Sequence, residues 1–101
     1  MANPAYLIVA IDIHDQEAFG SYVEQAVPML QEYGGVILAA TPNLTVERGV
    51  WPCQHLTLIK FPSPFQAEQF YQSEAHQPVK ALRKSASDGD LVLVQGQPDS
   101  E

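Results

Sequence analysis

Three short runs of aliphatic and β-branched residues limit this chain more than any other feature, because the strands they predict are apolar on both faces. In "YLIVAIDI" (residues 6–13), one set of alternate positions is wholly aliphatic, and Ile8 and Ala10 make the other set apolar too. In the runs "VILAA" (36–40) and "LVLVQ" (91–95), both sets of alternate positions are likewise apolar. A sheet with one solvated face should alternate apolar and polar residues. The predicted sheet therefore needs cover on both faces.

Helical periodicity follows the first strand. Asp15 is a suitable N-cap, and Gly34-Gly35 is a suitable helix end. Between them, apolar residues recur at steps of three and four, which predicts one amphipathic helix, kinked or narrowed at Pro28. The stripe consists of Phe19, Tyr22, Val23, Ala26, Val27, Leu30 and Tyr33.

The middle of the chain predicts two further strands and a loop. The strand at 36–40 is expected to bend at 41–43, and residues 44–47 are a possible continuation of it. Residues 48–54 read as a loop. The alternating run His55–Phe61 then predicts the third strand.

A helix-start pattern opens the last third of the chain. Ser63 suits the cap, Pro64 the first helical position and Gln66 a capping box, so a helix is expected to reach about Gln72. Ser73 can cap a second helix. The buried stripe of that second helix is predicted as Ala75, Val79, Leu82 and Ala86.

Asp88-Gly89 is typical of a turn and leads into the final strand at 91–95. The order is therefore β-α-β-β-α-β, which predicts an α+β domain with an antiparallel sheet and helices on one face only. Residues 1–101 form one domain, with 96–101 a frayed tail. Burying an aliphatic side chain is worth about 1.5–3 kcal/mol, so the second face should be covered. We expect a homodimer joined through that open face.

Composition excludes several classes of partner. The formal charge of −7, with 12 acidic and 5 basic side chains, argues against nucleic acid and against anionic membranes. The lone Cys53 excludes an internal disulfide and fits a cytoplasmic location. His14, His55 and His76 are not spaced as metal ligands, and no motif indicates a cofactor.

The stretch "YQSEAHQPVKALR" holds the main candidate site. One hypothesis is structural: Ser73 caps a helix, and Arg83 suits its carboxyl-terminal dipole. The other is that Tyr71, His76 and Arg83 border a cleft, where Arg83 holds a carboxylate or enolate and His76 moves a proton.

Three further residues are candidates. Trp51 can plug a dimer interface or stack on a ligand. His55 can face the interior as a catalytic group or simply end a strand. Asp12 lies in an otherwise apolar strand, where burial would make it a candidate base, although a wet position near the strand end explains it too.

The segments "YLIVAIDIHD", "YGGVILA", "WPCQHLTLIKFPS", "AEQFYQSEAHQPVKALR" and "SDGDLVLVQG" resemble a bacterial family of domains of unknown function. That family belongs to the dimeric α/β-barrel superfamily, so the resemblance implies a ferredoxin-like β-α-β-β-α-β sandwich whose sheet pairs with that of a second copy. Neighbouring families include cofactor-independent monooxygenases, muconolactone isomerases and haem-dependent chlorite dismutases. The chain departs from the family pattern at Phe70, where Trp is common, and at His76, where Tyr is common.

Two hypotheses for function follow. The first is a protein that binds a small apolar or carboxylate-bearing metabolite between sheet and helices, with cofactor-independent proton-transfer or oxygenase-like chemistry. The second is a non-catalytic dimeric structural or stress-accessory module. Ligand-binding candidates are Tyr71, His76, Arg83 and Trp51, and catalytic candidates are Asp12, His55 and His76.

Overall fold

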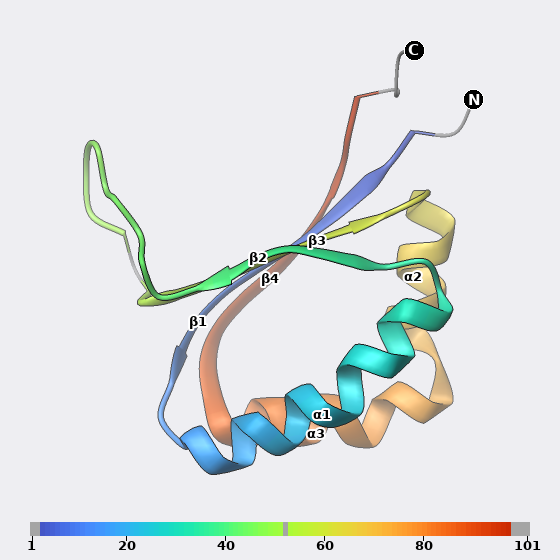
Figure 1. The fold of residues 1–101 in the computed structure, drawn as a ribbon, viewed down its shortest axis with the longest axis horizontal. Helices are drawn as coiled ribbons and strands as arrows, with labels where there is room; N and C mark the ends of the chain where they lie inside the picture. Colours follow the sequence, from blue (N-terminus) through green and yellow to red (C-terminus); the bar gives the residue numbers. More distant parts are fainter. Residues whose placement is uncertain (1–2, 52, 98–101) are drawn as a thin grey trace.

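Strand β1 (Ala5–Ile13) lies inside a four-stranded antiparallel sheet of order β2-β3-β1-β4. The computed structural model describes residues 3–51 and 53–97. β1 pairs with β3 (His55–Phe61) on one side and with β4 (Ser87–Gln95) on the other. Figure 1 shows all the helices below this sheet and none above it. The predicted ferredoxin-like α+β architecture is confirmed.

Helix α1 (Gln16–Glu32) starts and ends where local sequence signals indicate. The amide of Ala18 donates to Asp15 Oδ1 over 3.0 Å, so Asp15 is the N-cap. At the other end Gly34 takes a φ of +84°, and the amide of Gly35 donates to the carbonyl of Leu30 over 2.8 Å. The chain then turns into β2 (Val36–Thr41).

The β2 strand differs from its prediction. Its register against β3 shifts between Ile37 and Ala39, so the irregularity lies inside the strand rather than at 41–43. Residues 44–47 do not continue the strand but belong to a long connection to β3. A run of alternating side chains is not sufficient there, because the described residues of the connection leave the sheet and none of them pairs with a strand.

Helix α2 (Pro64–Gln72) begins at the predicted cap: the amide of Gln66 donates to Ser63 Oγ over 3.2 Å. The Gln66 side chain does not close a capping box. Its Nε2 donates instead to the carbonyl of Tyr33, and its Oε1 accepts from Ser63 Oγ. This side chain therefore joins α2 to the end of α1.

After α2, a short 3-10 turn η1 (Glu74–His76) leads into α3 (Gln77–Ala86). Ser73 Oγ accepts from the amide of His76, as a capping residue should. The predicted buried stripe is partly wrong, since Ala75 is exposed and Leu82 only half-buried. The buried face consists of His76, Val79, Arg83 and Ala86.

The prediction of a turn at Asp88-Gly89 is wrong, because both residues lie within β4, paired with Asp12 and Ile11. The glycine serves close strand packing rather than a turn. Its φ is +148°, and a Cβ built on it would stand 2.2 Å from the carbonyl oxygen of Ala10. The strand therefore starts at Ser87, four residues earlier than the apolar run suggests.

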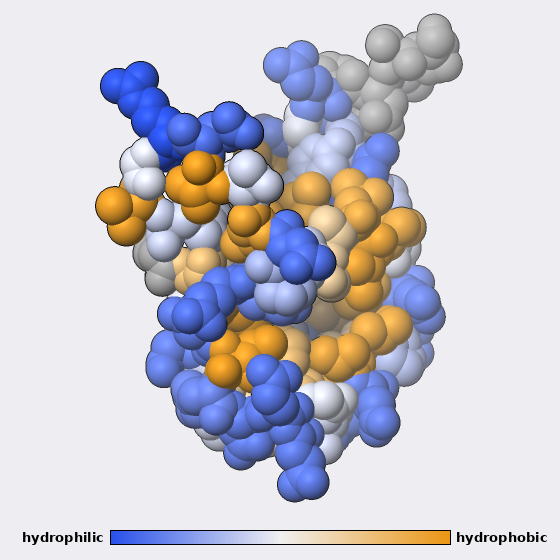
Figure 2. Space-filling model, turned by 60° about the vertical axis from the view of Figure 1, so that its left-hand side comes forward, coloured by the Kyte–Doolittle hydropathy of each residue, from blue (hydrophilic) through white to orange (hydrophobic). Residues whose placement is uncertain are grey.

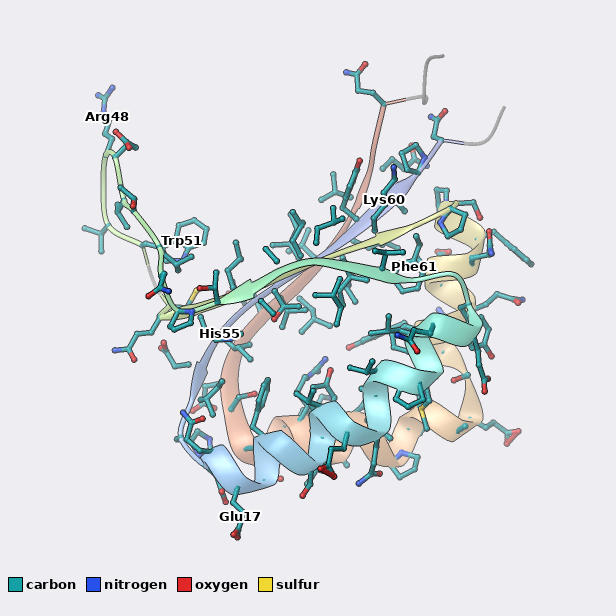
Figure 3. The ribbon with its side chains drawn as sticks, viewed as in Figure 1. Glu17, Arg48, Trp51, His55, Lys60 and Phe61 are labelled. Atoms are coloured by element: carbon teal, nitrogen blue, oxygen red, sulfur yellow. The ribbon has the colours of Figure 1, made fainter. Side chains whose placement is uncertain are left out.

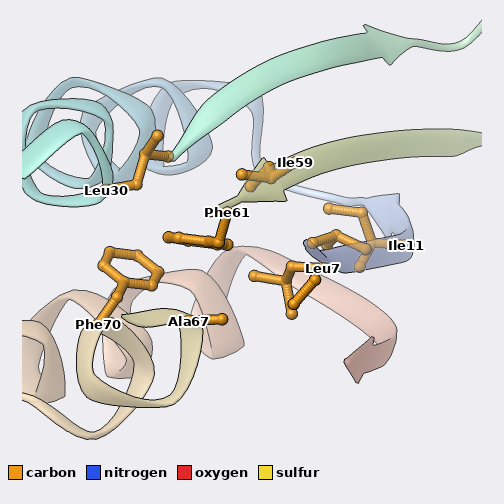
Figure 4. Close-up of a cluster of buried hydrophobic side chains, with 9 residues drawn as sticks. Leu7, Ile11, Leu30, Ile59, Phe61, Ala67 and Phe70 are labelled. Atoms are coloured by element: carbon orange, nitrogen blue, oxygen red, sulfur yellow. The ribbon is translucent and has the colours of Figure 1, made fainter. Parts of the chain in front are cut away.

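The core lies between the sheet and the helices (Figure 4). β1 and β3 contribute one set of alternate residues to it, and α1 and α2 contribute the opposite side. Its members are Ala5, Leu7, Val9, Ile11, Leu30, Ile59, Phe61, Ala67 and Phe70.

The other side of the sheet, which we term the open face, is also apolar. By the strand register, Ile8 pairs with Leu58 and Val92, and all three point away from the helices. Val36 is 57% exposed and Val92 is 51% exposed. Figure 2 shows apolar side chains gathered on the surface of the sheet.

The described ends of the chain, at Pro4 and Gly96, lie together at one end of the sheet (Figure 1). The amide of Gly96 donates to the carbonyl of Pro4 over 2.8 Å, and the rest of the expected tail, 98–101, lies outside the described residues. Within the described part of the chain, every helix is too short or too polar to cross a membrane.

Candidate functional site

Two ionisable side chains are buried in the layer between helices and sheet. His76 is 1% exposed and Arg83 is 7% exposed. The steps from His76 to Val79, Arg83 and Ala86 are three, four and three residues, so all four lie on one helical face. An apolar stripe would ordinarily occupy this face, and the two polar residues are therefore unusual.

His76 packs among aromatic rings. Its ring centroid lies 4.4 Å from that of Phe70 and 5.7 Å from that of Tyr71. Burial, together with the smaller effects of the positive charges of Lys80 and Arg83, lowers the pKa of His76 to about 4. The imidazole is therefore neutral at pH 7, and its Nδ1 is buried without a hydrogen-bond partner.

Arg83 contacts Tyr22 of α1. Burial raises the pKa of the Tyr22 phenol, and this effect outweighs the charge of Arg83 and its hydrogen bond to the phenol, both of which lower it. Nη1 of Arg83 is buried and has no hydrogen-bond partner. In the part of the chain that the structure describes, no carboxylate pairs with this guanidinium. An uncompensated buried charge is costly, so the site is suited to an anion.

Lys80 adds a second cation to the same region. Its Nζ lies 3.6 Å from the centroid of the Tyr71 ring, in a cation–π contact. Two of the five Lys and Arg residues of this acidic chain thus lie beside His76. We call Tyr22, Tyr71, His76, Lys80 and Arg83 the polar cluster.

A cavity of about 140 Å³ lies between α1 and the sheet. We call it the α1 chamber. Apolar side chains form most of its wall, and the polar groups in it are Tyr22, His55 and Thr57. The ring of His55 stands 6.3 Å from that of Phe19, and His55 Nδ1 is buried without a hydrogen-bond partner. Apolar cavities of about 150 Å³ bind benzene, so the chamber suits a compact ring.

A second cavity, of about 150 Å³, lies between α2 and the strands β1 and β4. Tyr71, Glu68 and Gln72 are its polar lining residues. Tyr22 lines the first cavity and Tyr71 the second, and the two phenols are close enough to interact electrostatically. Each cavity is lined by one of the candidate site residues predicted from the sequence, Tyr71 in the second cavity and His55 in the α1 chamber. The polar cluster lies between the two cavities, since its Tyr22 lines one and its Tyr71 lines the other.

The sequence candidates fall into two groups. Tyr71, His76 and Arg83 come together in the polar cluster, and His55 lies nearby in the α1 chamber. Asp12 and Trp51 belong to the other side of the sheet, and Figure 3 shows Trp51 on the long connection above it. Asp12 Oδ1 accepts a hydrogen bond of 2.7 Å from the amide of Gln54.

Tyr22 is the site residue that sequence reasoning missed. Its spacing places it in the apolar stripe of α1, which is correct for its ring. Only its hydroxyl distinguishes it from the neighbouring Phe19, and the contact with Arg83 spans 61 positions of the chain. No metal-like group of three His, Cys, Asp or Glu side chains occurs among residues 3–51 and 53–97.

Comparison with known proteins places the fold. Residues 4–97 match a family described as a domain of unknown function, DUF1330. No curated protein matches the chain. A crystal structure of a protein of unknown function from Rhodopseudomonas palustris is similar, with 14% identity and a TM-score of 0.77 over 100% of this chain and 86% of that one.

Two further solved structures share the fold. SnoaB from Streptomyces nogalater, a cofactor-independent oxygenase, has 12% identity and a TM-score of 0.69, with 97% of each chain covered. A protein of unknown function from Thermobifida fusca, described as dimeric and ferredoxin-like, has 14% identity and a TM-score of 0.51 over 94% of this chain and 91% of that one. At such identities the likeness concerns the fold alone.

Proposed function

This chain belongs to the DUF1330 family, and we propose that it binds a small organic anion in the layer between its helices and its sheet. The observation that carries the proposal is the guanidinium of Arg83, buried, with Nη1 unpartnered and with no carboxylate of the described chain beside it. A buried cation is tolerated when an anion is supplied to it. The anion here would come from the ligand.

The chemistry of the polar cluster indicates the ligand class. The planar fork of Arg83 suits a carboxylate or an enolate. Because the pKa of Tyr22 is raised, its phenol stays protonated and can donate to the same oxygen. His76, being neutral, adds no charge of its own at pH 7. The two cavities limit the apolar part of the ligand to about the size of one aromatic ring.

The test compares Arg83→Met with Arg83→Lys in thermal melts, using acetate, benzoate and 4-hydroxybenzoate as probes and benzyl alcohol as the neutral match for benzoate. If Arg83 binds the anionic group of a ligand, Arg83→Met should raise the melting temperature of the ligand-free protein, because the substitution removes an uncompensated charge. It should also abolish the benzoate-dependent rise of the wild type. Arg83→Lys should keep only part of that rise.

Lys84→Met is the matched control, since Lys84 is exposed on the same helix. It should leave both the melting temperature and the benzoate response unchanged. A lower melting temperature for Arg83→Met, with no carboxylate response in the wild type, would show that Arg83 is structural.

Proton transfer is the chemistry for which the α1 chamber is equipped. His55 presents a buried, unpartnered Nδ1 in an apolar cavity that Tyr22 also lines. Phenylpyruvate in deuterated water tests this: the wild type should exchange the α-protons faster than the spontaneous rate, and His55→Gln should not. Equal rates with and without protein would favour a non-catalytic binding module.

We also propose that the protein is a homodimer joined through the open face. The support is the apolar character of that face, together with the dimeric state given for the similar Thermobifida fusca protein. Light scattering at micromolar concentration should give twice the chain mass, and Leu58→Glu, at the centre of the face, should give a monomer. A monomeric wild type would refute the homodimer without affecting the ligand site.

A further inference from the structure

The long connection between β2 and β3, residues 42–51 and 53–54, forms what we call the arm. Figure 1 shows it rising from one end of the sheet, on the side opposite to the helices. It carries large apolar side chains that its own chain does not cover: Val50 is 96% exposed, Val46 50% and Trp51 46%. Figure 3 places Trp51 on the side of the arm that faces the open face, with Arg48 at the tip.

Both ends of the arm are fixed to the sheet. The amide of Gln54 donates to Asp12 Oδ1 on β1 over 2.7 Å, and the amide of Asn43 donates to Thr41 Oγ1 over 2.9 Å. A carboxylate that accepts from a backbone amide makes a strong hydrogen bond. Asp12 is thus a positioning residue for the arm, which explains why a carboxylate interrupts an apolar strand.

The apolar side of the arm is continuous with the open face. Leu56 pairs with Ala10 on that face, and it also lines a hollow of about 410 Å³ with the arm residues. Those arm residues are Leu44, Thr45, Val46, Glu47, Arg48 and Trp51. Figure 2 shows apolar side chains both on the arm and on the neighbouring surface of the sheet. Arm and face therefore form one surface that is bent at Leu56.

The open face alone is small for a stable interface. Strands β1 and β4, with nine residues each, are about 30 Å long, and four strands are about 15–19 Å across. Because β2 and β3 are shorter, the projected area is at most roughly 450–550 Å². Each partner in a stable complex buries about 800 Å². Protruding side chains make the accessible area of the open face larger than its projected area, but the face stays near the smallest area that a stable interface buries. The arm adds further area.

Charge decides how two copies would lie. Asp12, Asp88 and Asp90 all point to the open face at the end that carries the arm, whereas the opposite end carries the cation Lys60 between Tyr6 and Val36, with Val94 beside them. If two copies met with like ends together, six carboxylates would gather at one end of the interface. A two-fold axis that runs across the strands separates them and places each arm over the other end of its partner.

We propose that each arm packs on the open face of a second copy, at the end remote from that copy's own arm, so that Trp51 and Val50 cover apolar side chains around Val36 and Val94. This inference rests on the proposed homodimer and adds to it which segment completes the interface and in which orientation. The occupant of the apolar arm surface is thus another copy of the same chain.

Sedimentation equilibrium separates the two proposals. The double variant Val50→Ser/Trp51→Ser should remain folded and raise the dimer dissociation constant at least tenfold. Phe65→Ser is the matched control, because Phe65 is 68% exposed but lies on α2, on the helix side; it should leave the constant unchanged. If the double variant has the same dimer dissociation constant as the wild type, the arm has no role in the interface, although the face-to-face dimer stands. If the wild type is monomeric, the dimer itself is refuted.

Cross-linking tests the orientation. In a Cys53→Ser background, a short bifunctional maleimide should join two chains that carry both Trp51→Cys and Val36→Cys, and neither single variant should be joined. Covalent dimers from Trp51→Cys alone would show that the two arms meet each other, which would overturn the proposed arrangement.

Discussion

At the scale of single residues, His76 links protonation to folding. An unfolded His takes up a proton near pH 6.5, whereas in the folded protein its pKa is lowered to about 4. Between these values the unfolded state binds more protons, so stability present above pH 6.5 is lost as the pH falls towards 4. At about 1.4 kcal/mol per pH unit, the loss amounts to at most about 3.5 kcal/mol.

The prediction is that His76→Gln removes this part of the pH dependence. Urea unfolding at pH 7, 6, 5 and 4.5 should give curves of free energy against pH that are steeper for the wild type than for the variant. Carboxylates affect both proteins alike and cancel in the difference. Parallel curves would mean that folding does not lower the pKa of His76.

At the scale of elements, Gly89 shows how a strand depends on one missing side chain. Gly89→Ala would place a methyl group 2.2 Å from the carbonyl oxygen of Ala10 at a φ of +148°, and should cost more than about 2 kcal/mol of unfolding free energy. Gly20→Ala, in α1 with no atom within 4 Å of the new Cβ, should instead be neutral or stabilise by up to about 1 kcal/mol. Chemical denaturation measures both, and a Gly89→Ala variant as stable as wild type would disprove the close approach of β4 to β1.

Ser63 tests the start of α2. Its Oγ accepts from the amide of Gln66, and Ser63→Ala should lower the free energy of unfolding by about 0.5–2 kcal/mol. Ser85→Ala is a suitable control, because Ser85 is exposed and its hydroxyl bonds only to the preceding turn of α3. If both substitutions have the same small effect, the cap does not stabilise the helix.

Elements with local signals were predicted well. His55–Phe61 and the end of α2 at Gln72 match the structure, since alternation and capping depend on neighbouring residues. The turn at Asp88-Gly89 failed because glycine serves turns and close strand contacts equally, and only the position of Ala10 distinguishes them. The predicted stripe of α3 is partly misplaced because only apolar residues are assigned to its buried face, whereas His76 and Arg83 lie there too.

The candidate site was predictable only in part, for a similar reason. Tyr71, His76 and Arg83 lie within one short stretch, so their proximity could be inferred from helical spacing. Tyr22 joins them through the packing of α1 against α3, and the hydrogen bond from Gln54 to Asp12 joins residues 42 positions apart. Contacts of that range leave no periodic signal in a single sequence.

At the scale of the whole molecule, net charge opposes association. Two chains of −7 carry −14 together, so the proposed dimer assembles against its own repulsion. Salt screens such repulsion beyond about 10 Å at 0.1 M. Raising NaCl from 20 mM to 500 mM should therefore lower the dimer dissociation constant in sedimentation experiments. A constant that rises with salt would indicate an interface held by ion pairs instead.

The alternation along β1 has a consequence for how this protein can evolve. Leu7, Val9 and Ile11 face the helices, while Ile8 and Ala10 face the open side. If both proposals hold, one short stretch of the gene encodes two traits in interleaved codons, the proposed ligand preference in the odd-numbered ones and the proposed self-association in the even-numbered ones. A saturation library of this strand, sorted separately for each trait, should yield two sensitivity profiles that are out of step by one residue, so that natural selection could adjust either trait without disturbing the other.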